Sequence, residues 1–145
     1  MQIQIHALPG GEPAPHPTQT ILVADEADAF PCRRCMTDAQ PGDRLLLLPY
    51  DPFGAESPYT GHGPIFVHAD GCEPFRENGE VPEQLRRRLL AIRAYDRNAM
   101  MIGSDVVDGA FMEGAARRLL DVPGAAYAHV HYARAGCFAC RVERG

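Results

Sequence analysis

Two cysteine pairs near opposite ends of the chain are the feature that most constrains how this sequence can fold. Cys32 and Cys35 form one Cys-x-x-Cys pair, and Cys137 and Cys140 form the other. This spacing lets two thiols converge from one tight turn, as in half of a tetrahedral zinc site or in a redox dithiol. If both pairs bind one metal ion, the fold must bring the two ends of the sequence together.

The cellular compartment decides whether the five cysteines form disulfides or take part in metal or thiol chemistry. The N-terminal residues 1–6 lack the basic start and apolar core of a secretory signal. No apolar run approaches the roughly 20 residues that a membrane helix needs. We therefore expect a cytoplasmic protein without a membrane span. Disulfides are rare in the cytosol, so the two pairs and the single Cys72 favour metal or thiol chemistry over a disulfide framework.

Size and charge narrow the class of partner. With 145 residues, 46% of them hydrophobic and 23% charged, the chain has the composition of one soluble globular domain that can bury a core without a metal. The formal net charge of −5 and the absence of a basic stripe argue against nucleic-acid binding. The run Arg86-Arg87-Arg88 is interpreted as the solvated face of a helix. A small molecule and a protein both remain open as partners.

Short apolar or alternating runs between turn residues predict a chain made mostly of strands. The predicted strands are 2–5, 20–24, 44–48, 65–69, 92–95, 100–107, 125–133 and 138–142. The leucine run 44–48 should be buried on both faces. On 125–133, alternation should place Tyr127, His129 and His131 on one side of the strand.

Two helices are predicted between these strands. The first covers 83–90 and begins after Pro82. The second is capped by Asp108 and ends before Gly124. Its buried face should consist of Phe111, Met112, Ala115, Ala116 and Leu119.

Two segments rich in proline and glycine interrupt the pattern. Residues 9–17 should form a connector, and residues 49–64 a long loop of the kind that binds a ligand or moves. The sequence therefore predicts a single α+β domain over 1–145, with a mainly antiparallel sheet and about two helices. The thiols of Cys137 and Cys140 should lie at the tip of its last hairpin.

The favoured functional hypothesis is one structural zinc ion held by Cys32, Cys35, Cys137 and Cys140. Zinc prefers soft thiolates in a tetrahedron, which two such turns can supply. A closed four-thiolate site has no open position for a substrate, so this hypothesis predicts a scaffold or binding module.

Redox chemistry is the first alternative, because either pair could cycle as a dithiol. Arg33 and Arg34 lie inside the first pair, and a cation beside a thiol favours the thiolate. The thiolate serves both zinc binding and nucleophilic attack, so this feature does not separate the two hypotheses.

A thiol-dependent or metal-dependent enzyme is the second alternative. Cys72 would be a nucleophile, with His68 or His129 as its base and Asp70 or Asp105 as the orienting carboxylate. In the metal version, His129 and His131 point the same way from a strand, and His68 and Cys72 complete the site. The plainer interpretation is that a histidine on a strand is hydrogen-bonded in or near the core.

Several motifs together resemble a known family. They are Pro31-Cys32-Arg33-Arg34-Cys35, Pro41-Gly42 before an apolar strand, Gly63-Pro64-Ile65-Phe66-Val67-His68 followed by Cys72, Arg93-Ala94-Tyr95-Asp96, and the segment from Cys137 to Arg144. In this order they are similar to the bacterial family catalogued as domain of unknown function 1203, over most of the chain from about residue 21. The resemblance implies a single-domain bacterial protein and brings no activity with it. It directs attention to His68, Cys72 and His129 beside the cysteine pairs.

Overall fold

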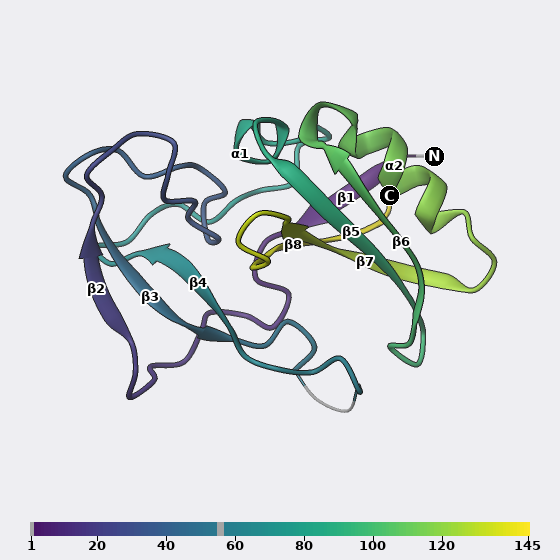
Figure 1. Cartoon of the computed structure of the whole chain (residues 1–145), viewed down its shortest axis with the longest axis horizontal. Helices are drawn as coiled ribbons and strands as arrows, with labels where there is room; N and C mark the ends of the chain where they lie inside the picture. The colour runs from purple at the N-terminus through teal and green to yellow at the C-terminus, as the bar shows by residue number, and fades with distance from the viewer. Residues whose placement is uncertain (1, 55–56) are drawn as a thin grey trace.

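The computed structural model describes residues 2–54 and 57–145, which form two antiparallel sheets and two α-helices (Figure 1). The five-stranded sheet has the order β1 (Ile3–His6), β8 (Phe138–Arg144), β7 (Ala125–Tyr132), β5 (Leu89–Asp96), β6 (Met101–Asp108). The three-stranded sheet has the order β2 (Thr20–Val23), β3 (Arg44–Tyr50), β4 (Gly63–His68). The predicted α+β class with a mainly antiparallel sheet is confirmed.

Alternation along β7 sets the two faces of the larger sheet. Ala128, Val130 and Tyr132 belong to the main core, beneath the helix α2 (Met112–Leu120). Tyr127 and His129 lie on the opposite face and contact other aromatic rings. The predicted alternation is therefore confirmed, and both faces of this strand are covered.

The predicted cap at Asp108 opens the turn that leads into the second helix. The Asp108 side chain accepts a hydrogen bond from the Ala110 amide at 3.0 Å. A short 3₁₀ helix, η1 (Gly109–Phe111), precedes α2, and this turn directs Phe111 outward, where it is 71% exposed. Phe111 was predicted on the buried face, and that prediction is wrong because the helical periodicity starts only at Met112.

The first helix is shorter than predicted. α1 covers only Glu83–Arg86, and residues 89–90 already belong to β5. Leu90 is fully buried and pairs with Val107 on one side and Tyr132 on the other. Burial between two strands outweighs the helix propensity of this leucine.

The leucine run forms a strand, as predicted, and this strand is the central one of the smaller sheet. Leu45 packs in a cluster with Ala24 and Ala39, whereas Leu48 packs in a separate cluster with Ile65 and other residues, so β3 is buried on both faces.

β3 and β4 also extend into the expected 49–64 loop, where Pro49 pairs with Pro64. Pairing of β2 with β3 ends at Thr20 and Leu47, so the absent N–H of Pro49 faces no strand on that side. The parts of 51–62 that the structure describes, and residues 9–17, contain neither helix nor strand.

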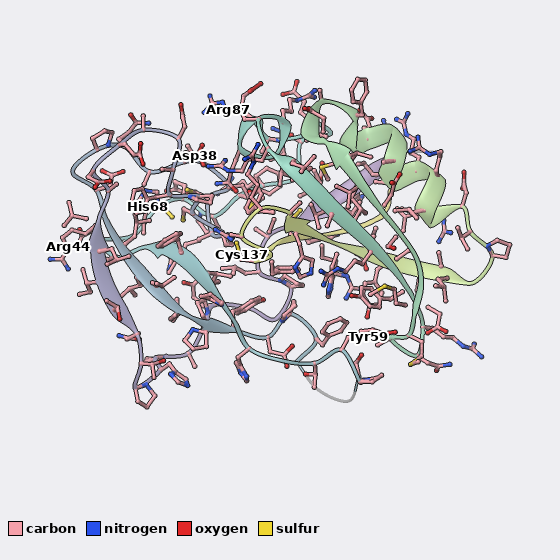
Figure 2. All side chains as sticks on the ribbon, viewed as in Figure 1. Asp38, Arg44, Tyr59, His68, Arg87 and Cys137 are labelled. Carbon is pink, nitrogen blue, oxygen red and sulfur yellow. The ribbon has the colours of Figure 1, made fainter. Side chains whose placement is uncertain are left out.

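The loop that carries Cys32 lies between the two sheets. Cys32 forms a parallel bridge with Phe66 of β4, and the Arg33 Nε donates a hydrogen bond to the Phe138 carbonyl of β8 at 2.8 Å. Figure 2 shows Cys137 in this central region, while His68 lies over the smaller sheet. Among the helices described, none has the length and apolar character needed to cross a membrane.

Candidate metal centre

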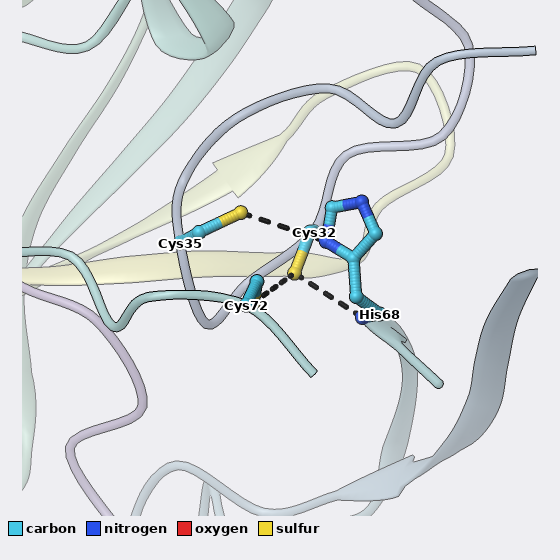
Figure 3. A group of neighbouring side chains, drawn as sticks. All are labelled: Cys32, Cys35, His68 and Cys72. Carbon is cyan, nitrogen blue, oxygen red and sulfur yellow. Dashed lines mark hydrogen bonds between the residues drawn. The ribbon is translucent and has the colours of Figure 1, made fainter. Parts of the chain in front are cut away.

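Four side chains from three short segments converge beside the smaller sheet (Figure 3). Cys32 and Cys35 come from the loop before β3, His68 is the last residue of β4, and Cys72 follows it by four positions. One ligand atom from each residue lies within 4.8 Å of all the others. The cluster is therefore compact enough to hold a metal ion.

Two distances show how well the cluster fits a tetrahedral ion. The sulfurs of Cys32 and Cys72 are 3.8 Å apart, and the Cys35 sulfur is 3.6 Å from Nδ1 of His68. With Zn–S and Zn–N bonds of about 2.3 and 2.1 Å, a regular tetrahedron places two sulfurs about 3.8 Å apart and a sulfur and a nitrogen about 3.6 Å apart. Three thiols and one imidazole are also a donor set that soft or borderline metals prefer.

The turn that presents the first two thiols is tight. The Met36 amide donates to the Cys32 carbonyl at 3.1 Å, and Met36 has a φ of 58° in the left-handed region. Met36 is 2% exposed and packs into the main core, which holds this uncommon conformation in place. The turn thereby directs both cysteine side chains toward β4.

Asp43 orients the histidine of the cluster. Its carboxylate lies 3.2 Å from Nε2 of His68. A hydrogen bond from the Gln40 amide, together with His68, lowers the pKa of Asp43 below its ordinary value. A charged carboxylate at Nε2 favours the tautomer with the proton on Nε2, so the lone pair of Nδ1 faces the thiols.

The cluster also stabilises a thiolate. The Cys35 thiol, and then backbone amides including that of His68, lower the pKa of Cys32 well below its usual value. The amide of His68 lies 3.3 Å from the Cys32 sulfur. The hydrogen bond with Cys32, and then burial, raises the pKa of Cys35. Arg34 contributes a guanidinium, whose Nη1 is 3.6 Å from the Cys72 sulfur and donates to the His68 carbonyl at 3.0 Å.

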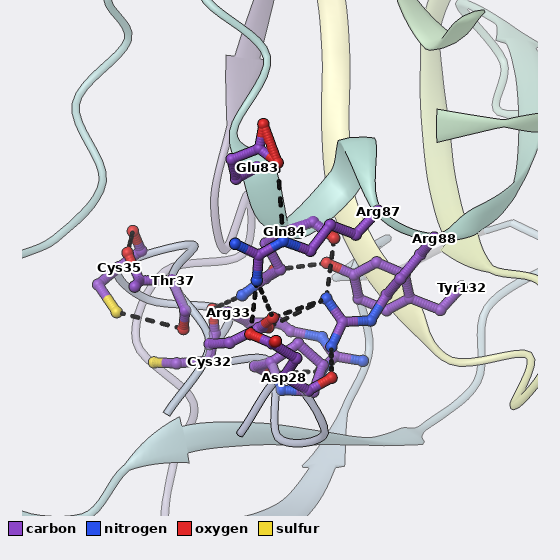
Figure 4. Close-up of polar contacts among 12 residues, drawn as sticks. Asp28, Cys32, Arg33, Cys35, Thr37, Glu83, Gln84, Arg87, Arg88 and Tyr132 are labelled. Carbon is purple, nitrogen blue, oxygen red and sulfur yellow. Dashed lines mark hydrogen bonds and ion pairs between the residues drawn. The ribbon is translucent and has the colours of Figure 1, made fainter. Parts of the chain in front are cut away.

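A polar network fixes the loop against the larger sheet (Figure 4). Gln84 of α1 donates to the Cys32 carbonyl at 3.1 Å and accepts a hydrogen bond from the Tyr132 hydroxyl. Arg88 forms an ion pair of 3.0 Å with Asp38, whose side chain is 4% exposed. The interpretation of the arginine run as a solvated face is thus wrong for Arg88, because the loop folds over its guanidinium.

The second cysteine pair does not join the first. Cys140 lies inside β8 opposite Val130 and is fully buried in the main core, where burial raises the pKa of its thiol. A β-bulge lies between this pair and the next one, in which Phe138 pairs with His131. Cys137 instead accepts a hydrogen bond from Nη2 of Arg33 at 2.9 Å. Cys140 is therefore not at a hairpin tip as predicted, because strand pairing continues through it.

His129, the third residue of the enzyme alternative, lies away from His68 and Cys72. Its ring is fully buried among Phe53, Tyr95 and two other aromatic side chains, with ring centroids 4.7 and 5.3 Å away for the first two. Neither ring nitrogen has a hydrogen-bond partner within residues 2–54 and 57–145. Burial lowers its pKa to about 3, so His129 is a neutral core residue.

The carboxylates proposed to orient a base also point elsewhere. Asp70 lies 3.5 Å from Arg44, and Asp105 lies 3.4 Å from Arg118. The residue that does orient His68 is Asp43, which no sequence motif singled out. Its position directly after Pro41-Gly42 gave no sign of this contact, since 25 residues separate it from His68.

Comparison with known proteins gives one match. A family model described as protein of unknown function (DUF1203) matches residues 29–144. No curated protein and no solved structure matches the chain. The matched region contains all five cysteines, His68 and Asp43.

Proposed function

This chain belongs to the DUF1203 family of proteins of unknown function, and from its own site we propose that it is a zinc-stabilised binding module. The ion would be held by Cys32, Cys35, His68 and Cys72. The observation that carries this proposal is that the four donor atoms all lie within 4.8 Å of one another, with one sulfur–sulfur distance of 3.8 Å and one sulfur–nitrogen distance of 3.6 Å that match a zinc tetrahedron.

A structural role follows from the number of ligands. Four protein ligands complete the coordination of zinc and leave no position for water or substrate. Cys32 is fully buried, and the His68 side chain is 16% exposed. The ion would supply a crosslink between the Cys32–Cys35 turn, the end of β4 and the segment after it, none of which belongs to the larger sheet.

A thiol catalyst is the second candidate, because one line of contacts favours it. The Cys35 sulfur, both ring nitrogens of His68 and the Asp43 carboxylate form a relay with steps of 3.6 and 3.2 Å. That order of nucleophile, base and orienting carboxylate is the one that thiol enzymes use. The nucleophile would then be Cys35 in place of Cys72, and because the pKa of the Cys35 thiol is raised, His68 would have to remove its proton during attack.

Metal analysis of purified variants tests the proposal. The full chain, purified without added metal, should contain about one zinc ion, as a single four-ligand site requires. Cys72→Ser and His68→Ala should lose most of it, whereas the matched control Cys137→Ser should retain it.

Two results would contradict this assignment. Loss of zinc from Cys137→Ser with retention in Cys72→Ser would favour the four-cysteine site. Protein free of metal, with a Cys35 thiol that reacts rapidly with iodoacetamide only while His68 is present, would favour the thiol catalyst.

A further inference from the structure

A cavity of about 490 Å³ lies between the two sheets and shares no residue with the four ligands of the proposed metal site. Its walls come from both sheets, from the loop between β3 and β4, and from the turn before β8. Sites for small molecules typically have volumes of about 300–1,000 Å³. The cavity therefore has room for a ligand of one or two rings.

Aromatic side chains form much of the wall. The ring of Tyr95 meets Phe53 edge to face at 5.1 Å and Tyr59 at 5.5 Å. On the other side, Tyr50 and Phe138 lie 5.9 Å apart. These rings support one another and leave the cavity open, so they offer preformed faces to a flat apolar group. Tyr59, labelled in Figure 2, is 40% exposed.

The charged side chains that line the cavity are all positive. Arg33 and Arg93 line the cavity, and none of its described lining residues is an aspartate or glutamate. The guanidinium of Arg33 already donates hydrogen bonds to the carbonyls of Pro31 and Phe138 and to the Cys137 sulfur. Arg93 forms no ion pair with any carboxylate in the described part of the chain. The partly exposed Arg93 therefore presents its guanidinium to the cavity with no acidic partner among the described residues.

The neighbours of Arg93 are neutral and hold it in place. Nδ1 of His131 lies 3.1 Å from the Gly136 carbonyl and must therefore carry the proton. Nε2 of His131 can then accept from Nη1 of Arg93, 3.4 Å away. Burial, and then Arg93 itself, lowers the pKa of His131 to about 4, so the ring does not compete for an anion at neutral pH. The Tyr95 hydroxyl, another polar neighbour of Arg93, is also uncharged, because burial raises its pKa.

From this arrangement we propose that the cavity binds a small aromatic carboxylate. The carboxylate accepts paired hydrogen bonds from the guanidinium of Arg93, whose planar fork matches two carboxylate oxygens. The ring lies against Tyr59 and Tyr95. This site goes beyond the metal centre and does not depend on which ion the latter holds.

Titration of the zinc-loaded full chain with 2-naphthoate, followed by NMR of backbone amides, tests the site. The acid should bind saturably and shift amides of residues 59–63. The neutral 2-naphthamide should bind about tenfold or more weakly, because a hydrogen-bonded charge pair contributes about 1.5–3 kcal/mol, which is roughly a 10- to 100-fold change in affinity. The zinc content of the same samples, measured separately, keeps this test independent of the metal proposal.

Variants assign the effect to one residue. Arg93→Gln should weaken naphthoate binding about tenfold or more and abolish the preference for acid over amide. The matched control Arg97→Gln removes the same charge from the exposed turn of the same hairpin and should change neither. Tyr59→Ser, at a partly exposed position, should weaken acid and amide alike. Equal binding of acid and amide, wild-type affinity in folded Arg93→Gln, or no saturable binding of naphthoate would overturn the proposal.

Discussion

His68 and His129 carry the same imidazole in opposite surroundings. Asp43 faces Nε2 of His68 and leaves Nδ1 directed at a thiol. His129 is enclosed by aromatic rings, and its nitrogens have no described partner. Local contacts thus direct one histidine nitrogen at the thiols and keep the other histidine neutral.

Zinc affinity should depend on Asp43 although it is not a ligand. Asp43→Asn keeps the shape of the side chain and removes the charge that orients His68. We expect zinc affinity to fall about 10- to 100-fold, as is typical when a carboxylate behind a ligand histidine is lost. Competition with a chromophoric chelator measures this. Asp70→Asn is the control, because Asp70 faces Arg44; equal affinities in the two variants would argue against a ligand role for His68.

The acid stability of the protein should depend on His129. The pKa of this ring is lowered from 6.5 to about 3 by burial, with further contributions from His131, Arg141 and Arg93, against which Asp51 acts. At a pH between these two pKa values, the ring binds a proton in the unfolded chain but not in the folded chain. The stability that the neutral ring contributes is therefore complete above about pH 6.5 and is lost as the pH falls toward 3, by at most about 1.4 kcal/mol per pH unit.

His129→Phe should remove this loss. Urea unfolding at pH 7 and pH 5 should show a smaller decrease in stability for the variant than for the wild type, by about 1–2 kcal/mol. Metal loss at low pH affects both proteins and cancels in the comparison. Replacement of the exposed His16 by phenylalanine should leave the wild-type slope unchanged. The same pH dependence in wild type and His129→Phe would show that His129 is already charged or solvated in the folded state.

At the scale of elements, α1 and η1 pack so closely that their contact requires a glycine at position 109. A Cβ atom on Gly109 would lie 1.9 Å from the Leu85 carbonyl oxygen and 2.8 Å from the carbonyl carbon of Arg86. Both are backbone atoms, which cannot rotate away. The start of the second helix can therefore approach the first only with glycine at this position.

Alanine at two glycine positions should have opposite effects. Gly109→Ala should destabilise the protein by about 3 kcal/mol or more, since backbone must move. Gly114→Ala, inside α2 with only the Arg118 side chain near at 3.7 Å, should stabilise it by about 1 kcal/mol through helix propensity. Thermal unfolding of both variants checks this. A mild effect at Gly109 would mean that α1 and η1 are further apart than described.

At the scale of the whole molecule, the two sheets depend on different interactions. The larger sheet has a core of its own beneath α2. The loop before β3 and the end of β4 meet at the bridge between Cys32 and Phe66 and at the thiol cluster, where the amide of His68 lies 3.3 Å from the Cys32 sulfur. The proposed zinc ion would therefore stabilise one half of the molecule much more than the other.

Removal of zinc by a chelator should loosen that half selectively. Amide hydrogen exchange should accelerate about tenfold or more for residues 32–36 and 66–69, since a bound metal stabilises only the structure that binds it. The amide of Val130, in the middle of the larger sheet, should be little affected. Cys137→Ser should respond to the chelator as the wild type does. Uniform acceleration across both sheets, or none, would contradict a local structural site.

Much of the architecture is encoded in short stretches of sequence. Alternation assigns both faces of the strand around His129, and Asp108 caps the 3₁₀ turn that leads into the second helix. These features depend on neighbours a few positions apart, which is why pattern and propensity predict them. The sequence also identified the Cys32–Cys35 turn, because a tight turn is itself a local structure.

Only the tertiary structure decided which residues complete the site. Spacing shows that Cys137 and Cys140 are close along the chain. The pairing of Cys140 with Val130, however, buries the Cys140 thiol beneath α2. The neighbouring bulge leaves the Cys137 thiol in contact with Arg33. The pairing of β4 with β3 instead brings His68 to Asp43 and to the first cysteine pair. Strand order and register are set by the packing of the whole core, so the sequence alone determined half of the candidate site and the fold selected the other half.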